Sequence, residues 1–145
     1  MTSVKFEPAR PDDRPALETL LTALRLPTDD LPADLNGFLL AFDKGVLVGS
    51  IGIERVGACA LLRSFAVREN YRKAGLGRQL YEMALHFARD ARFSELWLIT
   101  DSAYTYFERQ GFERIERSNV PKDIGATAQF TALCPSSAVV MRKRI

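Results

Sequence analysis

One stretch decides the fold of this chain: Leu62-Arg63-Ser64-Phe65-Ala66-Val67-Arg68-Glu69-Asn70-Tyr71-Arg72-Lys73-Ala74-Gly75-Leu76-Gly77-Arg78. An apolar run ends at Val67, a basic loop follows, and a helical pattern begins at about Gly75. The first turn of a helix presents unpaired N–H groups and a partial positive charge. Glycines at 75 and 77 would let a phosphate approach that backbone closely. The stretch therefore predicts a strand, a loop and a helix that together hold a pyrophosphate.

Two common phosphate motifs do not match this loop. The P-loop of nucleotide hydrolases needs Gly, four residues and then Gly-Lys-Ser/Thr, and that pattern is absent from the sequence. The dinucleotide fingerprint needs a third glycine three residues after Gly77, where this chain has Leu80. What remains is Arg72-x-x-Gly75-x-Gly77 after a strand.

Working outward from this loop, the remaining chain divides into short strands and helices. Apolar runs and turn residues predict strands over 4–7, 37–42, 46–54, 58–67, 95–100, 112–116 and 138–141. Helical spacing predicts a first helix that begins after Asp12 or Asp13 and ends before Pro27. It predicts further helices over 31–35, 75–91, 102–110 and about 124–130. A three-strand meander followed by a helical crossover to a parallel strand indicates an α+β fold. We expect a single domain over residues 1–145 and a solvated basic tail at 142–144.

Composition indicates an ordinary globular protein. Of 145 residues, 47% are apolar and 26% are charged, and the net charge is +2 from 20 basic and 18 acidic residues. So small a charge predicts no partner among nucleic acids or membranes. With one histidine, His86, and two cysteines, Cys59 and Cys134, the chain shows no zinc-ligand spacing, so we expect no metal. The start lacks an apolar signal segment, which favours a cytoplasmic location.

The pattern Arg72-x-x-Gly75-x-Gly77 resembles the acetyl-CoA motif of the GNAT acetyltransferases, Gln/Arg-x-x-Gly-x-Gly/Ala, which follows the fourth strand and opens the third helix. The segment 103–112, Ala-Tyr-Thr-Tyr-Phe-Glu-Arg-Gln-Gly-Phe, is similar to the family's helix that ends in Phe-Tyr-x-x-x-Gly-Phe. The resemblance implies a mixed sheet of about seven strands, flanked by about four helices and splayed between strands four and five. It also implies acetyl-CoA as co-substrate, without a metal, and a homodimer, since family members are often dimers.

The resemblance also assigns the residues that bind acetyl-CoA. The backbone of Phe65, Ala66 and Val67 would hold the pantetheine arm and polarise the thioester carbonyl. The loop and first helical turn would hold the pyrophosphate through Arg72, Lys73, Ala74, Gly75, Leu76, Gly77 and Arg78.

The proton-transfer residues depart from the family pattern. The family often uses the tyrosine of Phe-Tyr-x-x-x-Gly-Phe as general acid, but here Tyr106 and Phe107 stand in the reverse order. Neighbours on a helix point about 100° apart, so Tyr106 is aimed elsewhere. Tyr104 shares the face of Phe107 and is the candidate acid, with packing as the alternative role. Glu54, at the end of an apolar strand, is the candidate base, with a solvated strand-end glutamate as the alternative.

Arg63 and Ser64 are the candidate substrate-binding residues. An arginine within an apolar strand could pair with a carboxylate, phosphinate or arsenate-like group. The alternative is an arginine that reaches the surface, and for Ser64 a role in a turn.

The sequence thus predicts direct transfer of acetyl to the primary amine of a small molecule, such as an amino acid or an anionic analogue. Short segments over 52–54, 61–64, 133–138 and 141–143 also look similar to the GNAT subgroup of bacterial arsenic-resistance operons (ArsN type). The rival hypothesis is a non-catalytic acyl-CoA-binding module that acts as a sensor or partner protein. A nucleic-acid-binding face over 68–78 is a third reading, which the balanced charge disfavours.

Overall fold

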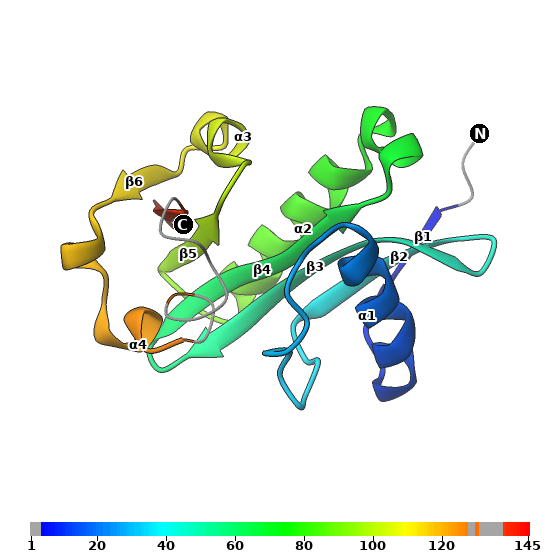
Figure 1. Cartoon of the computed structure of the whole chain (residues 1–145), viewed down its shortest axis with the longest axis horizontal. Coiled ribbons are helices and arrows are strands. Elements are labelled where there is room, and N and C mark those ends of the chain that lie inside the picture. Colours follow the sequence, from blue (N-terminus) through cyan, green and yellow to red (C-terminus); the bar gives the residue numbers. More distant parts are fainter. Residues whose placement is uncertain (1–3, 128–129, 131–137) are drawn as a thin grey trace.

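A single mixed sheet of seven strands organises the fold (Figure 1). The structure, a computed structural model, describes residues 4–127, 130 and 138–145. The strand order is β1-β2-β3-β4-β5-β7-β6. The strands are β1 (Val4–Pro8), β2 (Phe38–Asp43), β3 (Val46–Val56), β4 (Cys59–Val67), β5 (Glu95–Thr100), β6 (Glu113–Ile115) and β7 (Val139–Arg144). Among these described strands β4 and β5 alone pair in parallel, as the predicted crossover requires.

Helices cover both faces of this sheet. The α-helices are α1 (Arg14–Ala23), α2 (Leu76–Asp90), α3 (Tyr104–Arg109) and α4 (Lys122–Gly125), with 3-10 turns at Pro11–Asp13, Glu69–Ala74 and Arg117–Asn119. Figure 1 shows α1 in front of the sheet and α2 behind it. The crossover from β4 to β5 runs through α2. The predicted α+β fold, with its seven-strand mixed sheet, is confirmed.

The core forms on each face because apolar side chains repeat with the period of each element. The α2 face packs Leu76, Leu80 and Ala84 against β3 and β4. The α1 face packs Leu17, Leu20 and Leu21 around Phe38. A smaller cluster under α4 contains Leu61, Trp97, Ile124 and Val140.

The strands β4 and β5 separate soon after they meet. Along the described lengths of both strands they pair at two positions, Ala60 with Leu96 and Leu61 with Trp97. On its other side β5 pairs with β7 along all six of its residues, from Glu95 to Thr100. Beyond Leu61 the two parallel strands therefore diverge, and the sheet opens between its two halves.

A β-bulge in β4 lies beside this opening. Ser50 pairs with Ala66 and Gly52 pairs with Arg63, so Ile51 alone faces both Ser64 and Phe65. Ser64 has a left-handed backbone, with φ of 54°. The hydroxyl of buried Ser50 donates to the Ser64 carbonyl over 2.7 Å and so fixes the bulge.

Two predictions of secondary structure, for residues 31–35 and 142–144, are wrong. Residues 31–35 form no helix. Pro32 has no N–H to offer a helix, and the carbonyls of Pro32 and Ala33 accept hydrogen bonds from Arg14 instead. Residues 142–144 are not a solvated tail but continue β7, where Arg142 pairs with Glu113 on β6.

Candidate active site

The loop between β4 and α2 forms a corner at the N-terminus of the helix. The 3-10 turn Glu69–Ala74 ends at Gly75, whose left-handed backbone (φ 79°) precedes the first turn of α2. Space around this glycine is open, because an added Cβ would meet nothing within 4 Å. The first backbone bond of the helix runs from Gln79 N–H to the Gly75 carbonyl over 3.1 Å. The N–H groups of residues 76–78 are therefore left to a ligand or to solvent.

Gly77 faces the end of β4 from this first turn. A Cβ placed on Gly77 would lie 3.6 Å from Phe65 Cζ and 3.7 Å from Val67 Cγ2. A methyl group at position 77 would therefore make ordinary contacts with the end of β4.

The basic side chains around this corner divide into two groups. Arg68 Nε donates to the Leu47 carbonyl and Arg72 Nε donates to the Val67 carbonyl, each over 2.9 Å, so both brace the loop. Lys73 and Arg78 lie exposed beside the first turn of α2, with Arg78 paired to Glu82 at 3.0 Å. All of these side chains still contribute positive charge at the helix N-terminus.

Tyr71 also connects the loop between β4 and α2 to the rest of the sheet. The Tyr71 hydroxyl in the 3-10 turn donates to Asp43 at the end of β2. This hydrogen bond raises the pKa of Tyr71. Sequence reasoning missed this contact, because the two residues are far apart in the chain and belong to no motif.

Phe65 also belongs to an aromatic cluster with two residues of α3. Its ring centroid is 6.0 Å from that of Phe107 and 6.2 Å from that of Tyr106. Phe107, which stands at the family's tyrosine position, is buried, with 5% of its surface exposed. Burial raises the pKa of Tyr106, whose charged neighbours Arg78 and Glu82 belong to α2. Tyr104, the candidate acid, is 39% exposed at the start of α3. The structure does not test its role, which stays a prediction.

Arg63 sits at the centre of a charged cluster on the other face of the sheet. Its Nη2 donates to Asp30 Oδ1 over 2.8 Å, and its Nη1 donates to Asp30 Oδ2 over 3.0 Å. The same Nη1 donates to Glu54 Oε1 over 2.8 Å and to the Asp30 carbonyl over 3.2 Å. Its Nε donates to Ser64 Oγ over 3.3 Å.

This cluster leaves the two carboxylates, rather than the guanidinium, open to a ligand. The exposed fraction of the side chain is 1% for Arg63, 12% for Asp30 and 28% for Glu54. A cavity of about 240 Å³ is lined by Asp30, Glu54, Arg55, Val56, Leu61, Arg63 and Thr127. Glu54 pairs with Leu61, the last residue of β4 that pairs with β5, so the cavity lies where the sheet opens.

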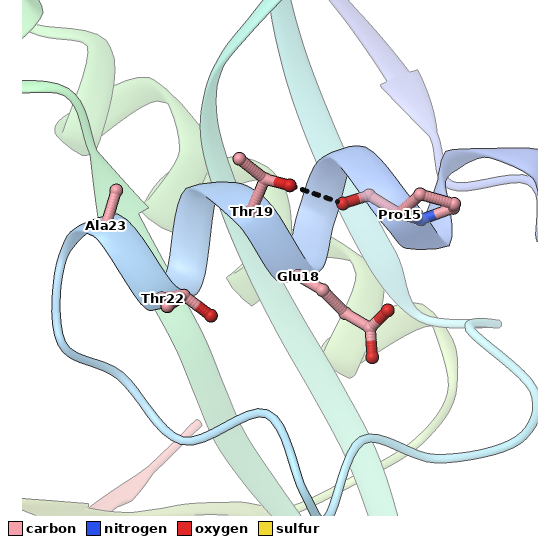
Figure 2. Close-up of a pocket in the computed structure, with 5 residues that line it drawn as sticks. All are labelled: Pro15, Glu18, Thr19, Thr22 and Ala23. Atoms are coloured by element: carbon pink, nitrogen blue, oxygen red, sulfur yellow. Dashed lines mark hydrogen bonds between the residues drawn. The ribbon is translucent and has the colours of Figure 1, made fainter.

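A second, more open concavity lies on the exposed side of α1 (Figure 2). It is lined by Pro15, Glu18, Thr19, Thr22 and Ala23, and Thr19 donates a 3.0 Å hydrogen bond to the Pro15 carbonyl of its own helix. Glu18 is the only ionisable side chain among these residues. The concavity therefore offers no acid–base pair, and the cavity at Glu54 is the better candidate.

Comparison with known proteins agrees with this geometry. The sequence profile of the acetyltransferase (GNAT) family matches residues 5–112, which is most of the chain. The chain belongs to the GNAT acetyltransferase family. A curated relative, an uncharacterized N-acetyltransferase from Chlorobaculum tepidum, is 28% identical over 102 residues, which cover 70% of this chain and 65% of the relative.

Solved GNAT structures share the fold. An acetyltransferase from Streptococcus agalactiae superposes with a TM-score of 0.78 at 22% identity and covers 100% of both chains. An N-acetylglutamate synthase from Neisseria gonorrhoeae, complexed with coenzyme A and L-arginine, superposes with a TM-score of 0.81 at 17% identity. The match covers 100% of this chain but 34% of the synthase, so this GNAT chain spans about a third of that relative's length.

The residues of this GNAT chain that were predicted from sequence fall into two groups in space. Phe65, Gly75 and Gly77 come together around the opening at the helix end, while Glu54, Arg63 and Ser64 come together on the opposite face. The first group suits the phosphates of coenzyme A, because the space around Gly75 is open and the N–H groups of residues 76–78 lie beside it. The individual binding roles remain proposals.

The sequence alone did not identify two residues of this candidate site. Asp30 lies in an irregular loop with no motif, and only the folded chain shows that it grips Arg63. Ser50 lies within an apolar run, and this position indicates a buried hydroxyl that needs a hydrogen-bond partner.

Other kinds of site receive no support among the described residues. In the ranges 4–127 and 138–145, together with residue 130, no group of three or more His, Cys, Asp or Glu side chains is placed to hold a metal ion. No helix in that part of the chain is long and apolar enough to cross a membrane. Cys59 is half-buried and free, and burial raises the pKa of its thiol. Cys134 lies outside the described residues.

Proposed function

We propose that this GNAT protein transfers acetyl from acetyl-CoA directly to the primary amine of a small molecule. The observation that carries the proposal is the opening between β4 and β5. It has the Gly75–Gly77 corner at one end and the Glu54 carboxylate beside its mouth. Such an arrangement holds a donor and an acceptor on the two faces of one strand.

The residues of β4 and α2 would fix the donor. The N–H groups of residues 76–78 and the positive charges of Lys73 and Arg78 would bind the pyrophosphate. The backbone of Phe65, Ala66 and Val67 would hold the pantetheine arm where β5 no longer pairs with β4. Acetyl-CoA supplies the acetyl group as a thioester, and preorganised N–H donors on β4 would stabilise negative charge that develops on its carbonyl oxygen.

Glu54 would handle the proton of the acceptor. Its Oε1 is bound to Arg63, and 28% of the side chain remains exposed towards the cavity. An amine enters mostly as an ammonium ion, so a carboxylate must accept a proton, directly or through water, before nitrogen can attack. The C–N bond then forms, the C–S bond breaks, the sulfur leaves with its electron pair, and the nitrogen of the new amide releases its remaining surplus proton to water. Tyr104 would be the donor of a proton to that sulfur, with water as the alternative.

The acceptor in this proposal is a small molecule, which is either an amino acid (or an anionic analogue) or a cationic amine. The neisserial N-acetylglutamate synthase, although similar in fold only, supports a small-molecule acceptor. An amino acid or anionic analogue would bind the guanidinium of Arg63, as the sequence suggested, and would have to displace Asp30. A cationic amine would need no displacement.

Thiol release from acetyl-CoA tests the proposal. The purified chain is incubated with acetyl-CoA and with single amines from a panel of amino acids, monoamines, polyamines and aminoglycosides. Amine-dependent release of the free thiol, with the acetylated amine identified by mass spectrometry, is the expected result. Binding of acetyl-CoA without turnover of any amine would refute the enzymatic proposal.

A non-catalytic acyl-CoA-binding module is the second candidate, favoured by one observation. Phe107 stands where the family often has its acidic tyrosine, and its ring is packed against Phe112 with the centroids 5.5 Å apart. A module of this kind predicts tight binding of acetyl-CoA and no acetylated product. The thiol-release panel therefore separates the two functions.

Three further expectations remain predictions. They are the similarity to the GNAT proteins of arsenic-resistance operons, assembly as a homodimer, and a cytoplasmic location. Size-exclusion chromatography with light scattering tests the second.

A further inference from the structure

Among the described residues that line the cavity at Glu54, two carboxylates face a ligand, and the buried cation Arg63 is already paired within the chain. We propose that this site accepts amines that lack a carboxylate beside the reacting nitrogen, and that Asp30 enforces this choice by occupying the fork of Arg63. The inference rests on the proposed function, since it names the substrate class of the same site.

The hydrogen bonds of Arg63 carry the first step. A guanidinium has five N–H donors, and a carboxylate ligand needs two that lie side by side. Asp30 takes that pair, with Oδ1 on Nη2 at 2.8 Å and Oδ2 on Nη1 at 3.0 Å. Glu54 Oε1 takes a further bond from Nη1 at 2.8 Å. A ligand carboxylate would therefore find the fork already bound.

Burial supports the same conclusion. The Arg63 side chain is 1% exposed, whereas Asp30 and Glu54 retain 12% and 28%. A molecule in the cavity would thus meet oxygen acceptors first, and these suit an ammonium group with its three donors. A carboxylate in the same place would face two like charges across a short distance.

The local charge count agrees. Asp30 and Glu54 together carry two negative charges, and Arg63 supplies one positive charge, which leaves an excess of one negative charge. Arg55 also lines the cavity, but its guanidinium lies 4.3 Å from the ring centroid of Phe93, a residue of the α2-side core. Its charge is therefore directed to the opposite face of the sheet.

Paired ligands test the inference independently of turnover. Calorimetry on the full chain saturated with coenzyme A compares phenethylamine with phenylalanine and cadaverine with lysine. The members of each pair differ only in the carboxylate. We expect the amine of at least one pair to bind at least tenfold more tightly than its amino acid. Equal or tighter binding of the amino acids overturns the inference, as does the absence of binding by all four ligands at millimolar concentration.

An Asp30 variant tests the mechanism of the choice. Asp30→Ala should free the Arg63 fork and shift the affinity ratio towards the amino acid of each pair by at least tenfold. Asp29→Ala, at the exposed neighbouring position, should leave the ratio unchanged. Asp30→Asn keeps the side-chain volume, and replaces Asp30→Ala if the alanine variant has lost its cooperative thermal transition. An unchanged ratio in the folded variant contradicts the role of Asp30.

Turnover separates this inference from the proposed function. If the amines bind with the expected preference but none is acetylated, the proposed transfer fails and the assignment of the pocket stands. If amino acids are acetylated efficiently while the matched amines are inert, transfer stands and the inference fails.

Discussion

Adding a single methyl group at Gly77 should separate ligand binding from folding. The first turn of α2 turns Gly77 towards the end of β4, and a Cβ there would lie 3.6 Å from Phe65 and 3.7 Å from Val67. Both distances are ordinary contacts, so Gly77→Ala should fold without strain. Because alanine is the better helix former by about 0.5–1 kcal/mol, the variant should be as stable as the native chain or slightly more so.

The same methyl group should weaken the binding of acetyl-CoA. It would project towards the end of β4 and hold the proposed ligand away from the N–H groups of residues 76–78. A charge-assisted hydrogen bond is worth about 1.5–3 kcal/mol, so the loss of one such bond lowers the affinity at least tenfold, by about 1.4 kcal/mol. Gly77→Val, which adds two more carbons towards Phe65, should bind more weakly still.

Calorimetry with coenzyme A and thermal unfolding measure the two effects on the same samples. Gly125→Ala is the matched control, since Gly125 is also helical, and the nearest atom to its added Cβ is Phe130 Cε1 at 4.0 Å. That variant should keep its affinity. Native affinity in folded Gly77→Val would refute the assignment of this corner to the pyrophosphate and pantetheine.

Three further predictions test other parts of the site and fold. Glu54→Gln should lower kcat while leaving the affinity for acetyl-CoA nearly unchanged, and a native rate and pH profile would eliminate Glu54 as the base. The hydrogen bond from Arg142 lowers the pKa of Glu113 below 4.5. This hydrogen bond therefore stabilises the fold above pH 4.5, and the stabilisation is lost as the pH falls through the lowered pKa. The thermal midpoints of the native chain and Glu113→Gln should therefore differ at pH 7 and converge in acid, and a constant difference would exclude this linkage. Burial raises the pKa of Tyr81 to about 12, so the neutral phenol favours the folded state and stability falls above pH 10. The pKa values of Tyr71 and Tyr106 are raised as well, so phenolate absorbance should show several late titrations, and Tyr81→Phe should lose the one near pH 12.

The sequence predicts the fold well where local rules decide it. The helical spacing of Leu76, Leu80 and Ala84 predicted α2, and the meander that contains the strands over 37–42 and 46–54 predicted the pairing of β2 with β3. Gly75 and Gly77 could be identified from the sequence for the same reason. Few residues other than glycine suit a left-handed turn or a helix start that a ligand approaches closely.

The sequence could not predict contacts made by loops across the fold. Leu31 and Leu35 have helical spacing, yet both pack against the α1-side core from an irregular segment. Asp30, one residue before, is thereby brought to Arg63 across 33 residues of sequence. Without this partner, Arg63 looks like a free cation ready for an anionic ligand. The structure reverses that expectation of the local charge, and no rule based on residue type or spacing could have done so.

The bulge in β4 would allow one strand to serve both proposed substrates. In a regular strand, residues two apart share a face, so Arg63 and Phe65 would point the same way. Because Ser64 and Phe65 together face Ile51, the alternation shifts between them. Arg63 then meets Asp30 and Glu54 on the α1 side, whereas Phe65 meets Gly77 and Phe107 on the other side. The extra residue thus separates the proposed acceptor side from the coenzyme side, at the level where β5 leaves the sheet. The Ser50 hydroxyl that holds the Ser64 carbonyl is consequently part of the site, although it touches neither proposed substrate.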